Sequence, residues 1–206
     1  MTVIVDYDAG NVRSVQRACH YVGIDAEISF DPSRIATADR LIFPGVGSAE
    51  SAVETLRDRG IDEAIKTFYA TGNPMLGICL GLQILFEHSE EGNKTCLGIV
   101  AGATEKFNFS DRSFKVPHIG WNEVLIPQQH PMLENIKSGD EFYFVHSYFV
   151  SPKSGDHVLG TTTYGDNTFC SVIGKDNLFA TQFHLEKSGE LGLKLLSAFK
   201  LWDATC

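Results

Sequence analysis

The pentapeptide Gly77-Ile78-Cys79-Leu80-Gly81 constrains the fold of this chain more than any other short segment. The apolar run at 75–78 predicts a buried strand, and the apolar stretch that follows, through residue 86, predicts a buried helix. A reactive residue between two glycines on a strand-to-helix turn is typical of the nucleophile elbow, where the turn leaves no room for neighbouring Cβ atoms. The helix N-terminus would favour a thiolate. A merely buried structural cysteine is the alternative, and the rest of the chain decides between them.

Strands and helices alternate on both sides of this elbow. We expect strands at 2–6, 26–29 and 40–43, a turn at 8–11, a helix from residue 12 to Gly23, and two helical segments between Ser48 and Tyr69. This alternation predicts an α/β fold with an open, doubly wound, mostly parallel sheet and helices on both faces.

The pattern changes after about residue 95. Strand-like segments are expected at 124–126, 141–145, 157–163, 169–173 and 178–182, joined by turns that favour antiparallel pairing, with a final helix over 189–202. The chain has 206 residues without a repeat or a linker-like stretch, so we expect one domain over 1–206.

Charge and cysteine usage exclude several classes of protein. The net charge of −9 without a basic stripe argues against nucleic acid as a partner. The N-terminal apolar run is too short for a signal peptide, and no apolar stretch reaches the roughly 20 residues needed to span a membrane. Five cysteines without a CxxC pair argue against a disulfide framework and a Cys-type zinc site. We expect a cytoplasmic protein with no metal.

A nucleophilic thiol needs a base, and His184 is the best candidate. It ends the apolar strand at 178–183, and Glu186 follows two residues later. Residues i and i+2 of an extended segment point to the same side, so the carboxylate can fix the imidazole tautomer while the other ring nitrogen faces Cys79. Cys79 and His184 both follow parallel strands, whose carboxyl ends carry functional groups.

Acyl transfer also needs donors for an oxyanion. We expect the Leu80 backbone N–H to be one donor, and the glycine-rich turn Pro44-Gly45-Val46-Gly47 to supply another. A phosphate loop is the rival interpretation of this turn, but the sixth position of a G-x-G-x-x-G motif is Glu50, and a Walker A motif is missing. Helix capping by Ser48 is compatible with the oxyanion role.

Two other enzyme classes share parts of this pattern. The segment His184-Leu185-Glu186 fits the H-x-E half of a zinc deaminase signature, but the P-C-x-x-C half is missing downstream. The α/β-hydrolases place their acid before the histidine in chain order, whereas here Glu186 follows His184.

With these motifs, essentially the whole chain resembles the class I, triad-type glutamine amidotransferases. Within them it is most similar to the glutaminase subunits of imidazole glycerol phosphate synthase. Besides the elbow and the His184 segment, the resemblance rests on 6–11, 44–48, 118–122 and 143–148. It implies Cys79 as nucleophile, His184 as base and Glu186 as orienting acid.

The resemblance also implies the surroundings of the triad. Backbone N–H groups at Val46, Gly47 and Leu80 would form the oxyanion hole. The residues that would bind glutamine are Gly45, Gly47, Gln83, Glu91, Ser147 and Tyr148. The residues that would face a partner are Asn11, Trp121, Asn122 and Tyr143.

The family's mechanism requires glutamine and no cofactor. It forms a γ-glutamyl thioester and passes ammonia to a (β/α)8-barrel cyclase in a heterodimer, which makes imidazole glycerol phosphate and AICAR in histidine biosynthesis. The family usually has His-Pro-Glu where this chain has Leu185, and the loss of proline relaxes the conformation of the turn. Two alternatives stay open: a related glutaminase that feeds another synthase, such as a sugar-amidating enzyme, and a non-catalytic regulatory partner.

Overall fold

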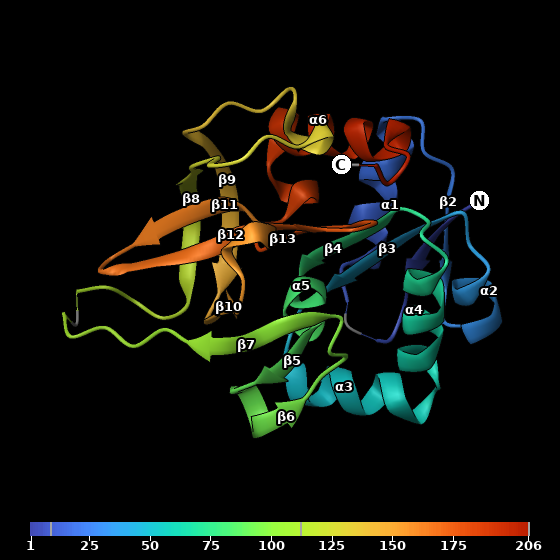
Figure 1. Cartoon of the computed structure of the whole chain (residues 1–206), viewed down its shortest axis with the longest axis horizontal. Coiled ribbons are helices and arrows are strands. Elements are labelled where there is room, and N and C mark those ends of the chain that lie inside the picture. Colours follow the sequence, from blue (N-terminus) through green and yellow to red (C-terminus); the bar gives the residue numbers. More distant parts are fainter. Residues whose placement is uncertain (9, 112, 206) are drawn as a thin grey trace.

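A large mixed β-sheet runs through the centre of the molecule in the computed structural model, which describes residues 1–8, 10–111 and 113–205 (Figure 1). The turn expected at 8–11 includes Ala9, which lies outside the described residues. Helices α1 and α6 lie on one side of the sheet, and α3 and α5 lie on the other (Figure 1). The described residues therefore have the expected α/β architecture with helices on both faces.

The helices are α1 (Val12–Tyr21), α2 (Pro32–Ala36), α3 (Ala49–Asp58), α4 (Ile61–Ala70), α5 (Leu80–Ile84) and α6 (Gly189–Leu201). The first seven strands are β1 (Thr2–Val5), β2 (Ala26–Ser29), β3 (Arg40–Gly45), β4 (Met75–Cys79), β5 (Phe86–Ser89), β6 (Lys94–Thr95) and β7 (Val100–Lys106). The others are β8 (His118–Val124), β9 (Asp140–His146), β10 (Tyr148–Pro152), β11 (Val158–Tyr164), β12 (Asn167–Lys175) and β13 (Leu178–Thr181). Short 3₁₀ turns include η2 (Pro131–Leu133) and η4 (Leu185–Lys187).

Strand order places the elbow strand in the middle of the sheet. The order is β2-β1-β3-β4-β13-β12-β10-β7-β5-β6, with β11 paired to β12 and with β8 and β9 forming a separate hairpin. The neighbours of β4 are β3 and β13, and both run parallel to it. From β13 through β12 and β10 to β7 the pairing is antiparallel, as expected for the C-terminal half, whereas β7 and β5 pair in parallel. The carboxyl ends of β3, β4 and β13 therefore meet at one edge.

Alternating side chains build two cores. Along β1, Val3 and Val5 face the core under α3 and α4, whereas Ile4 faces the core under α1 and α6. Along β3, Leu41 and Ile42 divide in the same way. A strand buried on both faces reads as a continuous apolar run, which is why β1, β3 and β4 lack polar alternation in the sequence.

Several expected boundaries were wrong. The apolar stretch after the elbow forms a helix only over α5, and Phe86 instead begins strand β5. The strand expected at 124–126 lies earlier, as β8 over His118–Val124. The expectations also omitted α2, β5, β6, β7 and β10. The first strand ends at Val5 and the last helix at Leu201, each one residue short of the expected boundary.

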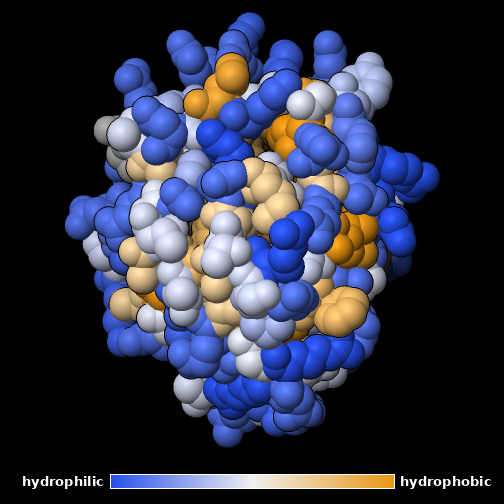
Figure 2. Space-filling view, turned by 90° about the vertical axis from the view of Figure 1, so that its right-hand side faces the viewer, coloured by the Kyte–Doolittle hydropathy of each residue, from blue (hydrophilic) through white to orange (hydrophobic). Residues whose placement is uncertain are grey.

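Opposite sides of the molecule present different surfaces. The side formed by α2 and α4 is mainly hydrophilic, with its apolar side chains in small separate groups (Figure 2). The β8–β9 hairpin lies toward the opposite side (Figure 1) and exposes two large apolar side chains: Ile119 is 59% exposed and Trp121 is 54% exposed. No helix in the described part of the chain is long and apolar enough to cross a membrane.

Candidate active site

Cys79 occupies a strained turn between β4 and α5. Its φ of 54° and ψ of −108° lie outside the regions that non-glycine residues favour, as at a nucleophile elbow. A Cβ on Gly81 would overlap the carbonyl oxygen of Phe43, and one on Gly77 would lie 2.9 Å from the Cβ of Ala180. Both glycines are therefore needed for close approach. Because α5 has only five residues, its dipole contributes less to a thiolate than the longer expected helix would.

His184 reaches the elbow from the adjacent strand. In the β4–β13 pair Thr181 lies opposite Ile78, so the chain beyond β13 passes beside Cys79. The Nδ1 of His184 lies 2.7 Å from Oε1 of Glu186, and both side chains are 1% exposed. Because a carboxylate only accepts, Nδ1 carries the hydrogen, which leaves Nε2 for the thiol. This Nε2 makes no hydrogen bond within the described residues.

The charges around His184 favour its protonated form. Burial opposes the imidazolium, but the electrostatic attraction of Cys79 and Glu186 and the hydrogen bond to Glu186 outweigh burial and raise the pKa of His184 to about 10. At neutral pH the ring therefore holds a proton beside the sulfur. A protonated histidine in this position can give its proton to a leaving group.

The turn that carries His184 is tied to strand β9. The backbone N–H of His184 donates to the carbonyl of Tyr143 at 3.0 Å, and the N–H of Tyr143 donates to the Ser188 hydroxyl at 3.0 Å. That hydroxyl donates in turn to the carbonyl of His184 at 2.6 Å. His184 is extended, with φ −91° and ψ 110°, and Leu185 is buried in the core. Hydrogen bonds thus hold the conformation that a proline at 185 would favour.

A cavity of about 470 Å³ opens over the elbow, a size in the range of small-molecule sites. Cys79 lies in its wall, while His184 and Glu186 lie buried outside its lining. The expected site residues that line it are Asn11, Val46, Gly47, Cys79, Leu80, Gln83, Glu91, Ser147 and Tyr148. Pro117, Val145, His146 and Lys187 complete the wall.

The expected oxyanion donors lie at this cavity. Gly47 has a φ of +99°, a conformation that favours glycine, and Leu80 is the first residue of α5, where no intrahelical acceptor precedes its N–H. Gly45 is not in the cavity wall. It pairs opposite Cys79 in the sheet, and a Cβ there would overlap the Tyr7 hydroxyl. The Ser48 hydroxyl accepts from the N–H of Glu50, so it does cap α3.

Two of the residues expected to bind glutamine, Gln83 and Glu91, make side-chain hydrogen bonds within the protein. The Nε2 of Gln83 donates to the Tyr148 carbonyl at 2.9 Å and to Oε1 of Gln182 at 3.1 Å. Oε2 of Glu91 accepts from the N–H of Ala49 at 2.6 Å, at the N-terminus of α3. These contacts fix the side chains of Gln83 and Glu91 in the cavity wall before any ligand binds.

The residues expected at a partner interface do not all share one surface. Asn11 lies in the cavity wall, and its side-chain amide donates to Oε1 of Glu186. Trp121 and Tyr143 are neighbours across the β8–β9 hairpin, with ring centroids 6.0 Å apart. Asn122 is half-buried and its amide donates to the Thr163 carbonyl at 3.0 Å.

Three residues that the structure brings to the site were not among those expected from the sequence. Gln182 lies with its Nε2 3.7 Å from the Cys79 sulfur. The chain bends at residues 182 and 183, just beyond the end of β13, so the alternation of side chains along a strand gave no signal for Gln182. His146 and Lys187 line the cavity, and the Lys187 ammonium lies 5.9 Å from the centre of the Tyr143 ring.

The other described cysteines are free and buried. Burial raises the pKa of the Cys19 and Cys170 thiols to about 12 and that of Cys96 to about 11, so these thiols stay protonated and unreactive at neutral pH. Within the described residues, no group of three or more His, Cys, Asp or Glu side chains is arranged to hold a metal ion.

Comparison with known proteins identifies the family. The model of the glutamine amidotransferase class-I family matches residues 3–201. The chain belongs to the class-I glutamine amidotransferase family. Solved structures share the amidotransferase fold: one described as a glutamine amidotransferase has a TM-score of 0.73 at 18% identity, covering 96% of this chain and 98% of its own. The glutaminase domain of CTPS from Trypanosoma brucei has a TM-score of 0.68 at 16% identity, covering 98% and 94%.

Curated relatives of this amidotransferase are much more similar in sequence. The imidazole glycerol phosphate synthase subunit HisH of Rhodopirellula baltica is 48% identical over 200 residues, 97% of this chain and 96% of the relative. The subunits of the same name from Desulfovibrio desulfuricans and Dehalococcoides mccartyi are 46% and 44% identical, and each covers 97% of this chain. The matched region is 93% of the length of the Desulfovibrio desulfuricans subunit and 96% of the length of the Dehalococcoides mccartyi subunit.

Proposed function

We propose that this chain is the glutaminase subunit of an imidazole glycerol phosphate synthase. It hydrolyses glutamine to glutamate and ammonia and passes the ammonia to a (β/α)8-barrel cyclase. The observation that carries the proposal is the arrangement of Cys79, His184 and Glu186 beside one cavity, in a chain 44–48% identical to three synthase subunits of that name.

The chemistry follows from the ionic state of the site. The Cys79 sulfur attacks the side-chain amide carbon of glutamine, and backbone N–H groups near Gly47 and at Leu80 stabilise the oxyanion. The C–N bond then breaks, and His184 gives its proton to the departing ammonia. Water, deprotonated by His184, hydrolyses the thioester and releases glutamate. Glu186 keeps the ring oriented throughout.

A partner is part of this proposal because ammonia released into water would be protonated and would lose its nucleophilicity. We propose a docking face formed by the outward side of β8, with Ile119 and Trp121, together with Tyr143 of β9. Large exposed apolar side chains of this kind are typical of protein interfaces. The docking face is bonded to the catalytic turn, since the Tyr143 carbonyl accepts from the N–H of His184. We also propose a cytoplasmic location, since a reducing compartment suits free thiols.

The test is a glutaminase assay on the full chain, alone and with the cyclase, with Cys79→Ser as the inactive control. We expect glutamate release and a trapped γ-glutamyl thioester for the wild type, and neither for the variant. Glutamate release without Cys79, or no turnover with any synthase, would contradict the catalytic assignment. Turnover only with a synthase of another pathway would contradict the assignment of the cyclase as partner.

The docking face is tested by titrating the chain with the cyclase. Trp121→Ala should weaken binding about tenfold or more, because a tryptophan buried at the centre of an interface commonly contributes about 2 kcal/mol or more. Tyr21→Ala is the matched control, since Tyr21 is 80% exposed on α1. Equal affinities for the wild type and Trp121→Ala would place the interface elsewhere.

A further inference from the structure

A buried chain of hydrogen bonds converges on the carbonyl oxygen of Tyr148. This oxygen lies 2.7 Å from Nδ1 of His146 and 2.9 Å from Nε2 of Gln83. A carbonyl can only accept, so both nitrogens must donate. The carbonyl thereby fixes the tautomer of His146 and the orientation of the Gln83 amide at the same time.

The histidine side of the chain is consistent with this assignment. With hydrogen on Nδ1, the Nε2 of His146 accepts from Nδ1 of His118 at 3.0 Å, and Nε2 of His118 faces the Asn122 amide at 3.3 Å. Burial lowers the pKa of His118 to about 4 and that of His146 to about 3, so both rings are neutral at physiological pH. The Tyr148 carbonyl is thus held by a donor that does not titrate in that range.

The glutamine side of the chain extends to the nucleophile. The second hydrogen of Gln83 Nε2 points to Oε1 of Gln182 at 3.1 Å, so the NH₂ group of Gln182 must face the other way. There it lies 3.7 Å from the Cys79 sulfur. Rotating the Gln182 amide by half a turn would set two NH₂ groups against each other and a carbonyl oxygen against the sulfur. The observed orientation is therefore the one that the surrounding bonds impose.

Burial makes this contact consequential. Gln182 is 0% exposed, so bulk water cannot replace its partners. Strand β13 ends at Thr181, beside the elbow strand, and the chain that follows it brings both the Gln182 amide and His184 to the buried side of Cys79. An N–H donor has little effect on a neutral thiol but forms a charge-assisted bond with a thiolate.

We propose that Gln182 is a further catalytic residue of this site, donating its side-chain N–H to the Cys79 sulfur and stabilising the thiolate that attacks glutamine. The inference rests on the proposed role of Cys79 as nucleophile. It adds a function for a residue outside the Cys79–His184–Glu186 triad. It also gives the buried contact between Gln83 and Gln182 a purpose, because that contact orients the donor.

The test is the pH dependence of Cys79 alkylation by iodoacetamide in the full chain, located by mass spectrometry of the modified peptide. Gln182→Met removes the donor at similar length, and we expect the pH midpoint of alkylation to rise by about one unit. Gln182→Glu keeps an acceptor for Gln83 and places negative charge beside the sulfur, so its midpoint should rise further. Gln129→Met and Gln129→Glu, at an exposed position, are the matched controls and should behave as wild type.

Glutaminase kinetics with the cyclase provide the second measurement. In Gln182→Glu we expect kcat for glutamine to fall about tenfold or more while KM stays within about twofold, because the wall contact of Gln83 is preserved. A wild-type midpoint in either folded variant, or a rise in KM with unchanged kcat, would overturn the proposal. If the methionine variant does not fold, the glutamate variant still decides. A wild-type chain without Cys79-dependent turnover would instead overturn the proposed function itself.

Discussion

Three buried neutral histidines should make this protein unstable in mild acid. Burial lowers the pKa of His118 and His130 to about 4 and that of His146 to about 3, from an ordinary 6.5. The unfolded chain therefore binds protons at a higher pH than the folded chain does. Their contribution to stability is complete above about pH 7 and is lost progressively as the pH falls from 6.5 toward 4.

The magnitude follows from proton linkage. Between about pH 7.5 and pH 5, each histidine whose pKa is lowered in this way costs about 1–2 kcal/mol of unfolding free energy, the lower figure allowing for solvent screening. The three together cost about 3–6 kcal/mol, a large part of the 5–15 kcal/mol that stabilises a typical domain. His184 acts in the opposite sense, because its raised pKa adds about 1–2 kcal/mol of stability as the pH falls from about 7.5 to 5, and this offsets only part of the loss. The acidic groups whose pKa is lowered at the surface, such as Asp31 and Asp39, titrate below this window.

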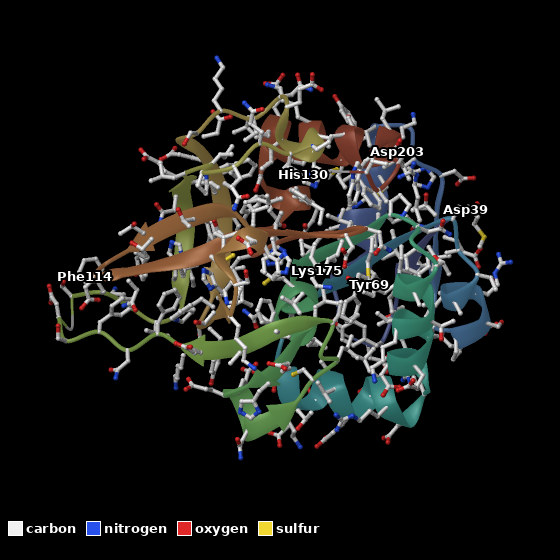
Figure 3. All side chains as sticks on the ribbon, viewed as in Figure 1. Asp39, Tyr69, Phe114, His130, Lys175 and Asp203 are labelled. Carbon is white, nitrogen blue, oxygen red and sulfur yellow. The ribbon has the colours of Figure 1, made fainter. Side chains whose placement is uncertain are left out.

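His130 offers the cleanest single test, because it lies away from the cavity, between the sheet and α6 (Figure 3). Its Nδ1 accepts from the N–H of Met132 at 3.1 Å and caps η2. Protonation would replace this acceptor by a donor, whereas His130→Asn keeps an acceptor and removes the titrating group. Between about pH 7.5 and pH 5, the unfolding free energy of the variant should therefore fall by about 1–2 kcal/mol less than that of the wild type.

The assay is urea unfolding at both pH values, with the loss compared within each protein so that any packing defect cancels. His20→Asn, on the exposed side of α1, is the matched control and should show the wild-type loss. If His130→Asn and the wild type lost the same free energy within about 0.5 kcal/mol, the reasoning from burial would be refuted.

Three further predictions concern the elbow and its surroundings. Gly81→Ala forces a Cβ against the Phe43 carbonyl and should lower the unfolding free energy by about 1–3 kcal/mol in thermal melts, whereas Gly155→Ala, which meets no neighbour, should be neutral. Tyr7→Phe removes a buried hydroxyl that has no partner within the described residues, so the urea midpoint should stay or rise; a clear fall would show that the hydroxyl is paired. Glu186→Gln removes the charge that orients the triad histidine, so kcat should fall at least about tenfold with KM little changed, and full activity would exclude that role.

The sequence predicted those helices and strands whose pattern of apolar and turn residues fits only one kind of secondary structure. Strand β2 was predicted at its observed boundaries, and the elbow followed from the glycines around Cys79. Residues 80–86 were ambiguous, because an apolar run of that length suits a buried helix or a buried strand, and Phe86 joined the sheet. The five-residue helix α2 buries only Ile35, and one buried residue cannot produce the helical periodicity of apolar residues that a sequence-based prediction needs.

Strand β8 was misplaced for a physical reason. Its inward positions include the polar His118 and Asn122, while the apolar Ile119 and Trp121 face outward. The usual alternation of apolar inside and polar outside is therefore inverted over most of the strand, and only its end resembled a strand in sequence. On the inward side of β8, His118 and Asn122 take part in hydrogen bonds, and on its outward side Ile119 and Trp121 form part of the proposed docking face.

Within the site, Cys79 and His184 could be proposed from the sequence because each chemical role demands a particular residue type, and their roles stay a prediction. Gln182 was not, because an amide has no role of its own until its orientation is known. That orientation depends on Gln83 and on the Tyr148 carbonyl, and so on three segments far apart in the chain.

The position of β13 also has a consequence for the order of events during synthesis. This strand comes from the last part of the described chain, yet it inserts between β4 and β12 in the middle of the sheet. Until residues 178–186 have been made and β13 has paired with β4, the sulfur of Cys79 lacks the proposed base His184, the proposed orienting acid Glu186 and the buried segment beside it. A growing or partly folded chain therefore has no means of hydrolysing glutamine, and glutaminase chemistry begins only when the central sheet is complete.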